Sequence, residues 1–274
     1  MPNESKKRKP LRAEKPKSSL AVWIAVATLG VGAVFGCVIC GGVGAWFYVN
    51  SSASAGIEGV WEYSGRNLPP NVRTVRLMTG NQLVNVNYER NQKTMILFSG
   101  GSYTFQGTIY KERIEYCSPG IQEVLLDKEQ SFRATIQANK MNVAGTLTNG
   151  NPINEDWQRI GTPTPGGRTP HEGPWQNTTA GLNPKSRSVK LIVGDQFMTI
   201  LSDRGRKTTL LLSGGKCSLN GNAYTETTEY CSPGNLQKFL GRPQALTMQV
   251  QGDQMSVSGT VGAVKVDETW NRIK

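Results

Sequence analysis

The chain has 274 residues, which is enough for one large or two small domains, and its formal net charge is +11. The positive charge is concentrated in residues 1–19, which contain seven Lys or Arg side chains against two Glu. No stripe of arginines and no basic segment interleaved with aromatic residues follows. The composition therefore argues against nucleic-acid binding.

Residues 20–49 form a run of 30 residues without a single charge. At about 1.5 Å per residue a helix of this length reaches ~45 Å, which is enough to cross a bilayer with some tilt. The basic flank precedes the run, so the positive-inside rule makes residues 1–19 a basic cytoplasmic tail. This pattern predicts a single-pass protein of the cell membrane, with everything after residue 49 outside the cytoplasm, in a periplasmic or other extracytoplasmic location.

The same run has two alternative interpretations besides a retained signal anchor. A cleaved signal peptide has an apolar core of only ~7–15 residues, which is much shorter than this one. The residues before Cys37 resemble a bacterial lipoprotein cleavage box, so a lipoprotein anchored at Cys37 is the second alternative. Because the apolar run continues past Cys37, a transmembrane helix over residues 20–49 is the preferred interpretation.

The chain contains an internal duplication. The string EYCSPG occurs at 115–120 and again at 229–234, which is an offset of 114 residues. The same offset relates many other positions, among them Gly59 and Gly173, Trp61 and Trp175, Arg73 and Arg187, and Tyr110 and Tyr224. A repeat of about 100 residues indicates a duplicated domain rather than a solenoid. We therefore expect a spacer (50–58), a first unit (59–160), a Gly/Pro-rich linker (161–172) and a second unit (173–274).

Within each unit, apolar and polar residues alternate with a period of two. Val75 and Leu77, for example, alternate with Thr74 and Arg76. Such alternation is typical of strands with one buried face, and turn signals such as Gly80-Asn81 separate the strands. We count about eight or nine short strands in each unit. A meander of that many strands closes most economically into a barrel, so an all-β fold of two tandem small antiparallel barrels is expected, preceded by one transmembrane helix.

Each unit begins with G-x-W and ends with E-x-W-x-R. In this respect it resembles the lipocalins and the wider calycin group, and the complete ordered pattern is similar to small bacterial lipocalin-like domains of undetermined function. The resemblance implies that the first-strand Trp packs under an Arg of the last strand at one end of each barrel. The residues of this structural signature would be Gly59, Trp61, Trp157 and Arg159 in the first unit, and Gly173, Trp175, Trp270 and Arg272 in the second. An eight-stranded barrel is filled by its own side chains or holds one small ligand.

A strand over residues 110–116 suggests a ligand site, because it places Tyr110, Glu112 and Tyr116 on one face. The second unit repeats the arrangement with Tyr224, Glu226 and Tyr230. A buried carboxylate needs a cation, and the candidates are Arg73 in the first unit and Arg187 in the second, on the faces of Val75 and Leu77 and of their equivalents. One hypothesis is a polar anchor for a ligand inside the barrel. The alternative is a structural buried pair that fixes the register of the barrel.

The extracytoplasmic cysteines admit two interpretations. Cys117 and Cys231 occupy equivalent positions, and oxidation is permitted outside the cytoplasm. A disulfide between them would require the two barrels to pack about a pseudo-twofold axis that brings the α-carbons within ~7 Å. The other interpretation is free, partly buried thiols. Cys217 has no equivalent, because Tyr103 occupies its position in the first unit.

The sequence offers few residues in patterns typical of catalytic sites. The single histidine, His171, falls in the linker, and no Cys/His metal spacing occurs beyond residue 49. A catalytic triad or a histidine-ligated zinc or haem is therefore not expected, and neither is a cofactor. The sequence favours non-catalytic binding of a small apolar or amphipathic ligand. The alternative function is a structural or interaction module whose filled barrels engage envelope proteins or polymers.

Overall fold

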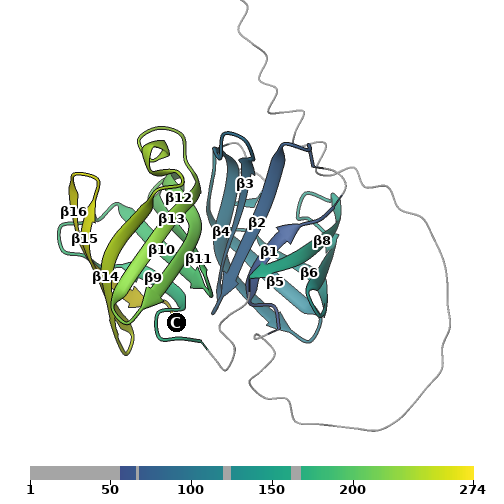
Figure 1. Ribbon diagram of the computed structural model, residues 1–274. Helices are drawn as coiled ribbons and strands as arrows, with labels where there is room; N and C mark the ends of the chain where they lie inside the picture. The colour runs from purple at the N-terminus through teal and green to yellow at the C-terminus, as the bar shows by residue number, and fades with distance from the viewer. Residues whose placement is uncertain (1–55, 66–67, 120–124, 162–167) are drawn as a thin grey trace, which may run out of the picture.

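The computed structural model describes residues 56–65, 68–119, 125–161 and 168–274. Within these ranges the chain forms two closed antiparallel barrels of eight strands each, and the short 3-10 helix η1 (Gln237–Phe239). Figure 1 shows the barrels side by side. The expected all-β fold with two tandem barrels is confirmed, at eight strands for each barrel.

Both barrels are meanders in which each strand pairs with the next and the last pairs with the first. The first barrel contains β1 (Gly59–Tyr63), β2 (Val72–Thr79), β3 (Gln82–Glu89), β4 (Met95–Gln106), β5 (Ile109–Cys117), β6 (Glu129–Gln137), β7 (Lys140–Thr146) and β8 (Pro152–Gly161). The second contains β9 (Gly173–Asn177), β10 (Ser186–Val193), β11 (Gln196–Asp203), β12 (Thr209–Asn220), β13 (Ala223–Cys231), β14 (Pro243–Gln251), β15 (Gln254–Val261) and β16 (Val264–Arg272).

The structure does not describe the predicted membrane segment. The basic tail (1–19), the predicted transmembrane helix (20–49) with Cys37, and most of the spacer lie outside the described residues. Among the residues that are described, none forms a helix of the length and apolarity that a membrane crossing needs.

The same arrangement of Trp and Arg in both barrels ties the first strand of each barrel to its last. The guanidinium of Arg159 in β8 lies 4.0 Å from the centroid of the Trp61 ring in β1, and it also donates hydrogen bonds to the carbonyls of Gly56 and Glu58. In the second barrel Arg272 lies 4.1 Å from the centroid of Trp175. Both indoles are fully buried, so each pair closes the barrel with a cation–π contact between its first and last strands.

Strand β2 is buried on both faces. Its residues Arg76 and Met78 point into the first barrel, where Met78 packs with Trp61 and other interior side chains. Val75 and Leu77 point outward, into an apolar cluster that also contains residues of the second barrel. The described residues therefore form three apolar cores, one inside each barrel and one between them.

The core between the barrels, called the junction below, consists of the outward-facing apolar residues of β2–β4 and β10–β12, together with Val60, Tyr116 and Tyr230. A pseudo-twofold axis relates the two barrels across this junction. The amide of Cys117 donates to the carbonyl of Lys207 at 3.2 Å, and the amide of Cys231 donates to the carbonyl of Lys93 at 3.1 Å. Residues 93 and 207, like 117 and 231, are 114 positions apart. The two barrels thus present the same surface to each other, as the subunits of a twofold dimer do.

Candidate functional site

The interior of the first barrel contains a buried polar cluster around Glu112. The hydroxyl of Tyr110 donates to Glu112 at 2.6 Å, and burial together with this carboxylate raises the pKa of Tyr110 well above its ordinary value. The cation beside the cluster is Arg76, whose guanidinium lies 4.2 Å from the centroid of Trp157 and 3.6 Å from the Glu155 carboxylate. A side chain of the barrel itself, Arg76, thus supplies a positive charge beside Glu112 and Glu155.

The second barrel repeats this cluster with a lysine in place of the arginine. Lys190 donates to Glu226 at 2.6 Å, and the hydroxyl of Tyr224 donates to the same carboxylate oxygen at 2.7 Å. The ammonium of Lys190 also lies 5.2 Å from the centroid of Trp270. Of the two interpretations made from the sequence, this closed set of contacts favours a structural buried pair.

The structure does not bring Arg73 to Glu112. Arg73 makes two hydrogen bonds to the Glu62 carboxylate, at 2.8 and 3.0 Å, and a third to the hydroxyl of Tyr88 at 2.8 Å. Its equivalent Arg187 donates to Glu115 of the other barrel at 2.6 Å. The reason is that Arg73 and Arg187 share the outward face of their strands, which faces the junction and not the barrel interior.

Tyr116 also leaves the face of Tyr110 and Glu112, because a β-bulge interrupts the pairing of β4 with β5. Gly101 pairs with Ile114 and Gly100 with Tyr116, so Glu115 is the extra residue. One inserted residue reverses the alternation of the strand. Tyr116 therefore points into the junction, and the equivalent bulge between Gly214 and Gly215 does the same to Tyr230.

The remaining residues of EYCSPG also build the junction. The hydroxyl of Ser118 accepts a hydrogen bond from the amide of Phe98 at 2.9 Å, while the amide of Ser118 donates to the carbonyl of Phe98 at 3.0 Å. Ser232 makes the same two bonds with Leu212, both at 2.8 Å. The repeated motif is thus an architectural segment that fastens the end of β5 or β13 to the preceding strand.

Cys117, Cys217 and Cys231 are free and buried, so the disulfide considered between Cys117 and Cys231 is not formed. Burial raises the pKa of Cys117 to about 11 and that of Cys217 to about 12. Burial raises the pKa of Cys231 as well. These thiols stay protonated at neutral pH and behave as small apolar side chains.

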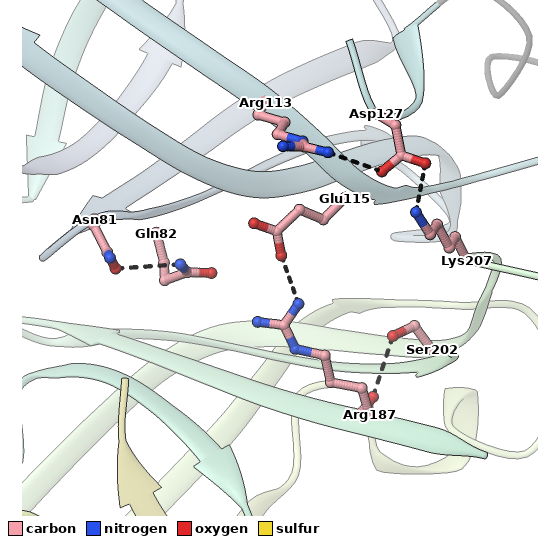
Figure 2. Close-up of polar contacts among 8 residues, drawn as sticks. All are labelled: Asn81, Gln82, Arg113, Glu115, Asp127, Arg187, Ser202 and Lys207. Carbon is pink, nitrogen blue, oxygen red and sulfur yellow. Dashed lines mark hydrogen bonds and ion pairs between the residues drawn. The ribbon is translucent and has the colours of Figure 1, made fainter. Parts of the chain in front are cut away.

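A cleft of about 420 Å³ opens at the edge of the junction. Figure 2 shows part of its lining, in which residues of β5 and the following loop face residues of the second barrel. Arg187 pairs with Glu115 at 2.6 Å, Lys207 pairs with Asp127, and Arg113 lies 4.0 Å from the same aspartate. The full lining, called the cleft below, consists of Ser102, Arg113, Glu115, Tyr116, Asp127, Arg187, Ser202, Asp203, Arg204 and Lys207.

The lining of the cleft is polar and bears an excess of basic side chains over acidic ones. At its base, burial raises the pKa of Tyr116, while the nearby Arg187 acts in the opposite direction. The phenol therefore stays protonated, and within the described part of the chain its hydroxyl has no hydrogen-bond partner. Such a site can hold a small polar or amphipathic molecule.

Two of the residues nominated from the sequence, Tyr116 and Arg187, line this cleft. The others of the nominated set are divided between the barrel interiors (Tyr110, Glu112, Tyr224 and Glu226) and the far side of the junction (Arg73 and Tyr230). Sequence reasoning missed Arg113, Asp127 and Lys207. The positions at which the two copies differ could have indicated Asp127 and Arg113. Asp127 is matched by Gly241 in the second copy, and Arg113 by Thr227.

The fold and the junction define a protein made of two tandem, eight-stranded antiparallel barrels joined through a pseudo-twofold contact. Over the residues that the structure describes, no group of His, Cys, Asp and Glu side chains gathers as a metal site.

No protein-family model and no curated protein matches the chain. Among solved structures, the chain is similar to a protein of unknown function from the DUF3598 family of Nostoc punctiforme PCC 73102. The identity is 13%, the match covers 82% of this chain and 100% of that one, and the TM-score is 0.23. A likeness of this degree transfers no function.

Proposed function

We propose that this protein is a membrane-anchored, non-catalytic binding protein that takes up a small polar or amphipathic molecule in the cleft between its barrels. The observation that carries the proposal is the cleft itself, which has about 420 Å³ of space and a charged lining from both barrels. Sites for small molecules commonly measure ~300–1,000 Å³ and lie preferentially where two domains meet.

The packing of the barrels favours the cleft over the barrel interiors as the binding site. The interior of the first barrel is occupied by large side chains that are at most 3% exposed, including Trp61, Tyr110 and Trp157. The second is occupied in the same way by Trp175, Tyr224 and Trp270. An eight-stranded barrel is just wide enough for its own side chains to fill. The apolar ligand expected inside a barrel is therefore the less favoured version of the proposal.

The proposed location rests on residues 1–49. The uncharged run at 20–49 would hold the barrels at the outer surface of the cell membrane, with the basic tail inside. Protease treatment of intact spheroplasts tests this arrangement. Removal of both barrels with retention of residues 1–49 in the membrane supports it, and full protection of the barrels contradicts it.

Native mass spectrometry of the full-length protein, released from a mild detergent after incubation with a library of small acids and amphiphiles, tests the binding function. The informative variant is Ser102→Trp, which places an indole in the cleft. Its control is Ser218→Trp, at an exposed position of β12 outside the cleft lining. The proposal predicts bound molecules in the wild type and the control and none in Ser102→Trp. Binding that survives Ser102→Trp, or an absence of any bound molecule, contradicts it.

A second candidate function is an interaction module that engages envelope proteins or polymers. This function is favoured by the filled barrels and by two exposed apolar residues at equivalent positions, Ile96 (48% exposed) and Leu210 (50% exposed). A photo-reactive amino acid at either position tests the idea in cells. Cross-links to one defined envelope component, formed equally in wild type and Ser102→Trp, support this candidate, and an absence of cross-links contradicts it.

A further inference from the structure

The duplication places the same three side chains on both sides of the junction. On one side Tyr116 lies near Arg187 and Glu115, and on the other Tyr230 lies near the equivalent Arg73 and Glu229. In each case burial raises the pKa of the tyrosine most, the glutamate adds to this increase, and the arginine opposes it. The junction therefore contains two equivalent sites, as the pseudo-twofold axis requires.

One of these sites is occupied by a side chain of the protein. The ring of Tyr88 stacks on Tyr230 with centroids 4.5 Å apart and an interplanar angle of 16°. Its hydroxyl accepts a hydrogen bond from Arg73 at 2.8 Å, and Arg73 is itself held by two bonds to Glu62. Tyr88 is only 4% exposed. A phenol ring thus fills the site, with its face on a tyrosine and its oxygen on an arginine.

The other site has Ser202 at the position of Tyr88. The hydroxyl of Ser202 donates to the backbone carbonyl of Arg187 at 3.2 Å, and a serine has no ring to stack on Tyr116. The cleft lies on this side, with Ser202, Tyr116 and Arg187 in its lining. The replacement of a tyrosine by a serine thus accounts for an open site on this side of the junction.

Arg187 donates one side-chain hydrogen bond where Arg73 donates three, because Gln176 stands where the first barrel has Glu62. Arg187 pairs with Glu115 instead, and its guanidinium lies over the Tyr116 ring at 5.8 Å from the centroid. This side chain covers Tyr116, which is 2% exposed. A ligand that offers the guanidinium an oxygen acceptor can draw it off the ring, toward the position that Arg73 adopts.

We propose that the cleft binds a small molecule with a hydroxylated aromatic ring, and that Tyr88 shows the mode of binding. The ring stacks on Tyr116 as Tyr88 stacks on Tyr230, and its hydroxyl oxygen accepts a hydrogen bond from Arg187 as Tyr88 does from Arg73. Arg113 and Lys207 share Asp127, and Arg204, the remaining basic side chain of the lining, suits a carboxylate at the other end of the molecule. This inference rests on the proposed function and names the ligand class for the same cleft.

The probe for the test is 4-hydroxyphenylacetate, titrated into the full-length protein and followed by isothermal calorimetry and saturation-transfer NMR. We expect binding to one site, about tenfold weaker binding of phenylacetate, which lacks the hydroxyl, and no detectable binding of cyclohexylacetate, which lacks the ring. Equal binding of all three acids overturns the inference but leaves the proposed function in place. Binding of library molecules in the cleft without any binding of 4-hydroxyphenylacetate also overturns the inference and leaves the proposed function in place.

Two reciprocal substitutions exchange the sites. Ser202→Tyr supplies the side chain that fills the opposite site, so it should abolish binding of the probe and raise the melting temperature. Tyr88→Ser empties that opposite site, so the stoichiometry should rise from about one to about two molecules per chain. Undiminished binding in Ser202→Tyr overturns the inference, as does an unchanged stoichiometry in Tyr88→Ser. Should one variant fail to fold, the other still decides the question.

Discussion

The ring of Tyr116 lies directly against Gly100, so closely that a β-carbon on Gly100 would stand 2.5 Å from the ring atom Cε2. Gly214 and Tyr230 have the same relationship, again at 2.5 Å. The two most conspicuous repeated motifs, SGG in β4 and β12 and EYCSPG at the end of β5 and β13, are therefore the two sides of one contact. That contact brings an aromatic ring of each barrel into the junction.

Substitution of Gly100 by Ala should destabilise the protein by about 1–3 kcal/mol, because the added methyl group forces the Tyr116 ring out of a packed position. Chemical denaturation measures the change. Gly56→Ala is the matched control, since a β-carbon there has nothing within 4 Å. Equal stability of the Gly100 and Gly56 variants would show that the ring moves without cost.

The junction should stabilise the folded protein as a hydrophobic core does. Leu191 is fully buried in the cluster that joins the barrels, so Leu191→Ala is expected to cost about 2–5 kcal/mol. Hydrogen exchange should then accelerate in β2 as well as in β10, because the two strands pack on each other. Leu182→Ala, at a position 37% exposed, serves as the control and should change stability by less than about 0.5 kcal/mol. A loss of protection confined to the second barrel would contradict the shared core.

Arg76 should be required for the stability of the first barrel. Its side chain is 6% exposed and lies beside Glu155 and Trp157. Arg76→Met leaves the buried Glu112 and the partly buried Glu155 without their cation, which should cost about 3–5 kcal/mol. Arg76→Lys should cost much less, because the second barrel functions with Lys190 at this position. Urea denaturation of the two variants compares them, and an equal loss in both would mean that the shape of arginine matters more than its charge.

Much of this architecture could be predicted from the sequence. The duplication located both barrels, and the period of two located their strands. The resemblance of the terminal motifs to those of the lipocalins implied the pairing of Trp61 with Arg159, which the structure contains. These features are local or repeated, so they need no knowledge of how the barrels pack.

The candidate site could be predicted only in part, because the sequence does not distinguish two kinds of buried face. In β2 the apolar pair Val75 and Leu77 marks the junction, whereas the barrel interior receives Arg76 and Met78. The bulge at Glu115, which turns Tyr116 outward, has no clear signal other than the paired glycines opposite it. The cleft depends on the packing of two barrels about an axis, which composition and periodicity do not encode.

The buried cysteines should resist alkylation. At pH 8 a thiol with a pKa of about 11, as in Cys117, is ionised in roughly one molecule in a thousand, and burial also blocks the reagent. Peptide mapping after iodoacetamide should therefore show Cys117, Cys217 and Cys231 unmodified in the native protein and fully modified in denaturant. Rapid native labelling of any of them, or a peptide that joins Cys117 to Cys231 under non-reducing conditions, would contradict this structure.

Glu155 should make the stability of the first barrel depend on pH. Burial raises the pKa of this carboxyl above its ordinary 4.5, although Arg76 and a hydrogen bond from Trp157 oppose the shift. The folded state therefore binds the proton more tightly than the unfolded state does. The stabilisation from this proton is complete below pH 4.5 and is lost as the pH rises through the pKa of the folded protein.

Glu155→Gln isolates this contribution, because the amide keeps an oxygen that can accept the hydrogen bond from Trp157, which measures 3.1 Å in the wild type. Unfolding free energies of both proteins, measured by urea denaturation between pH 4 and pH 7, give the comparison. The wild type should lose stability relative to Glu155→Gln as the pH rises. In a plot of unfolding free energy against pH the two curves therefore diverge, and the curve of the variant lies above that of the wild type toward pH 7. Parallel curves, or a wild type that gains on the variant toward pH 7, would mean that Arg76 outweighs burial and keeps the carboxylate ionised.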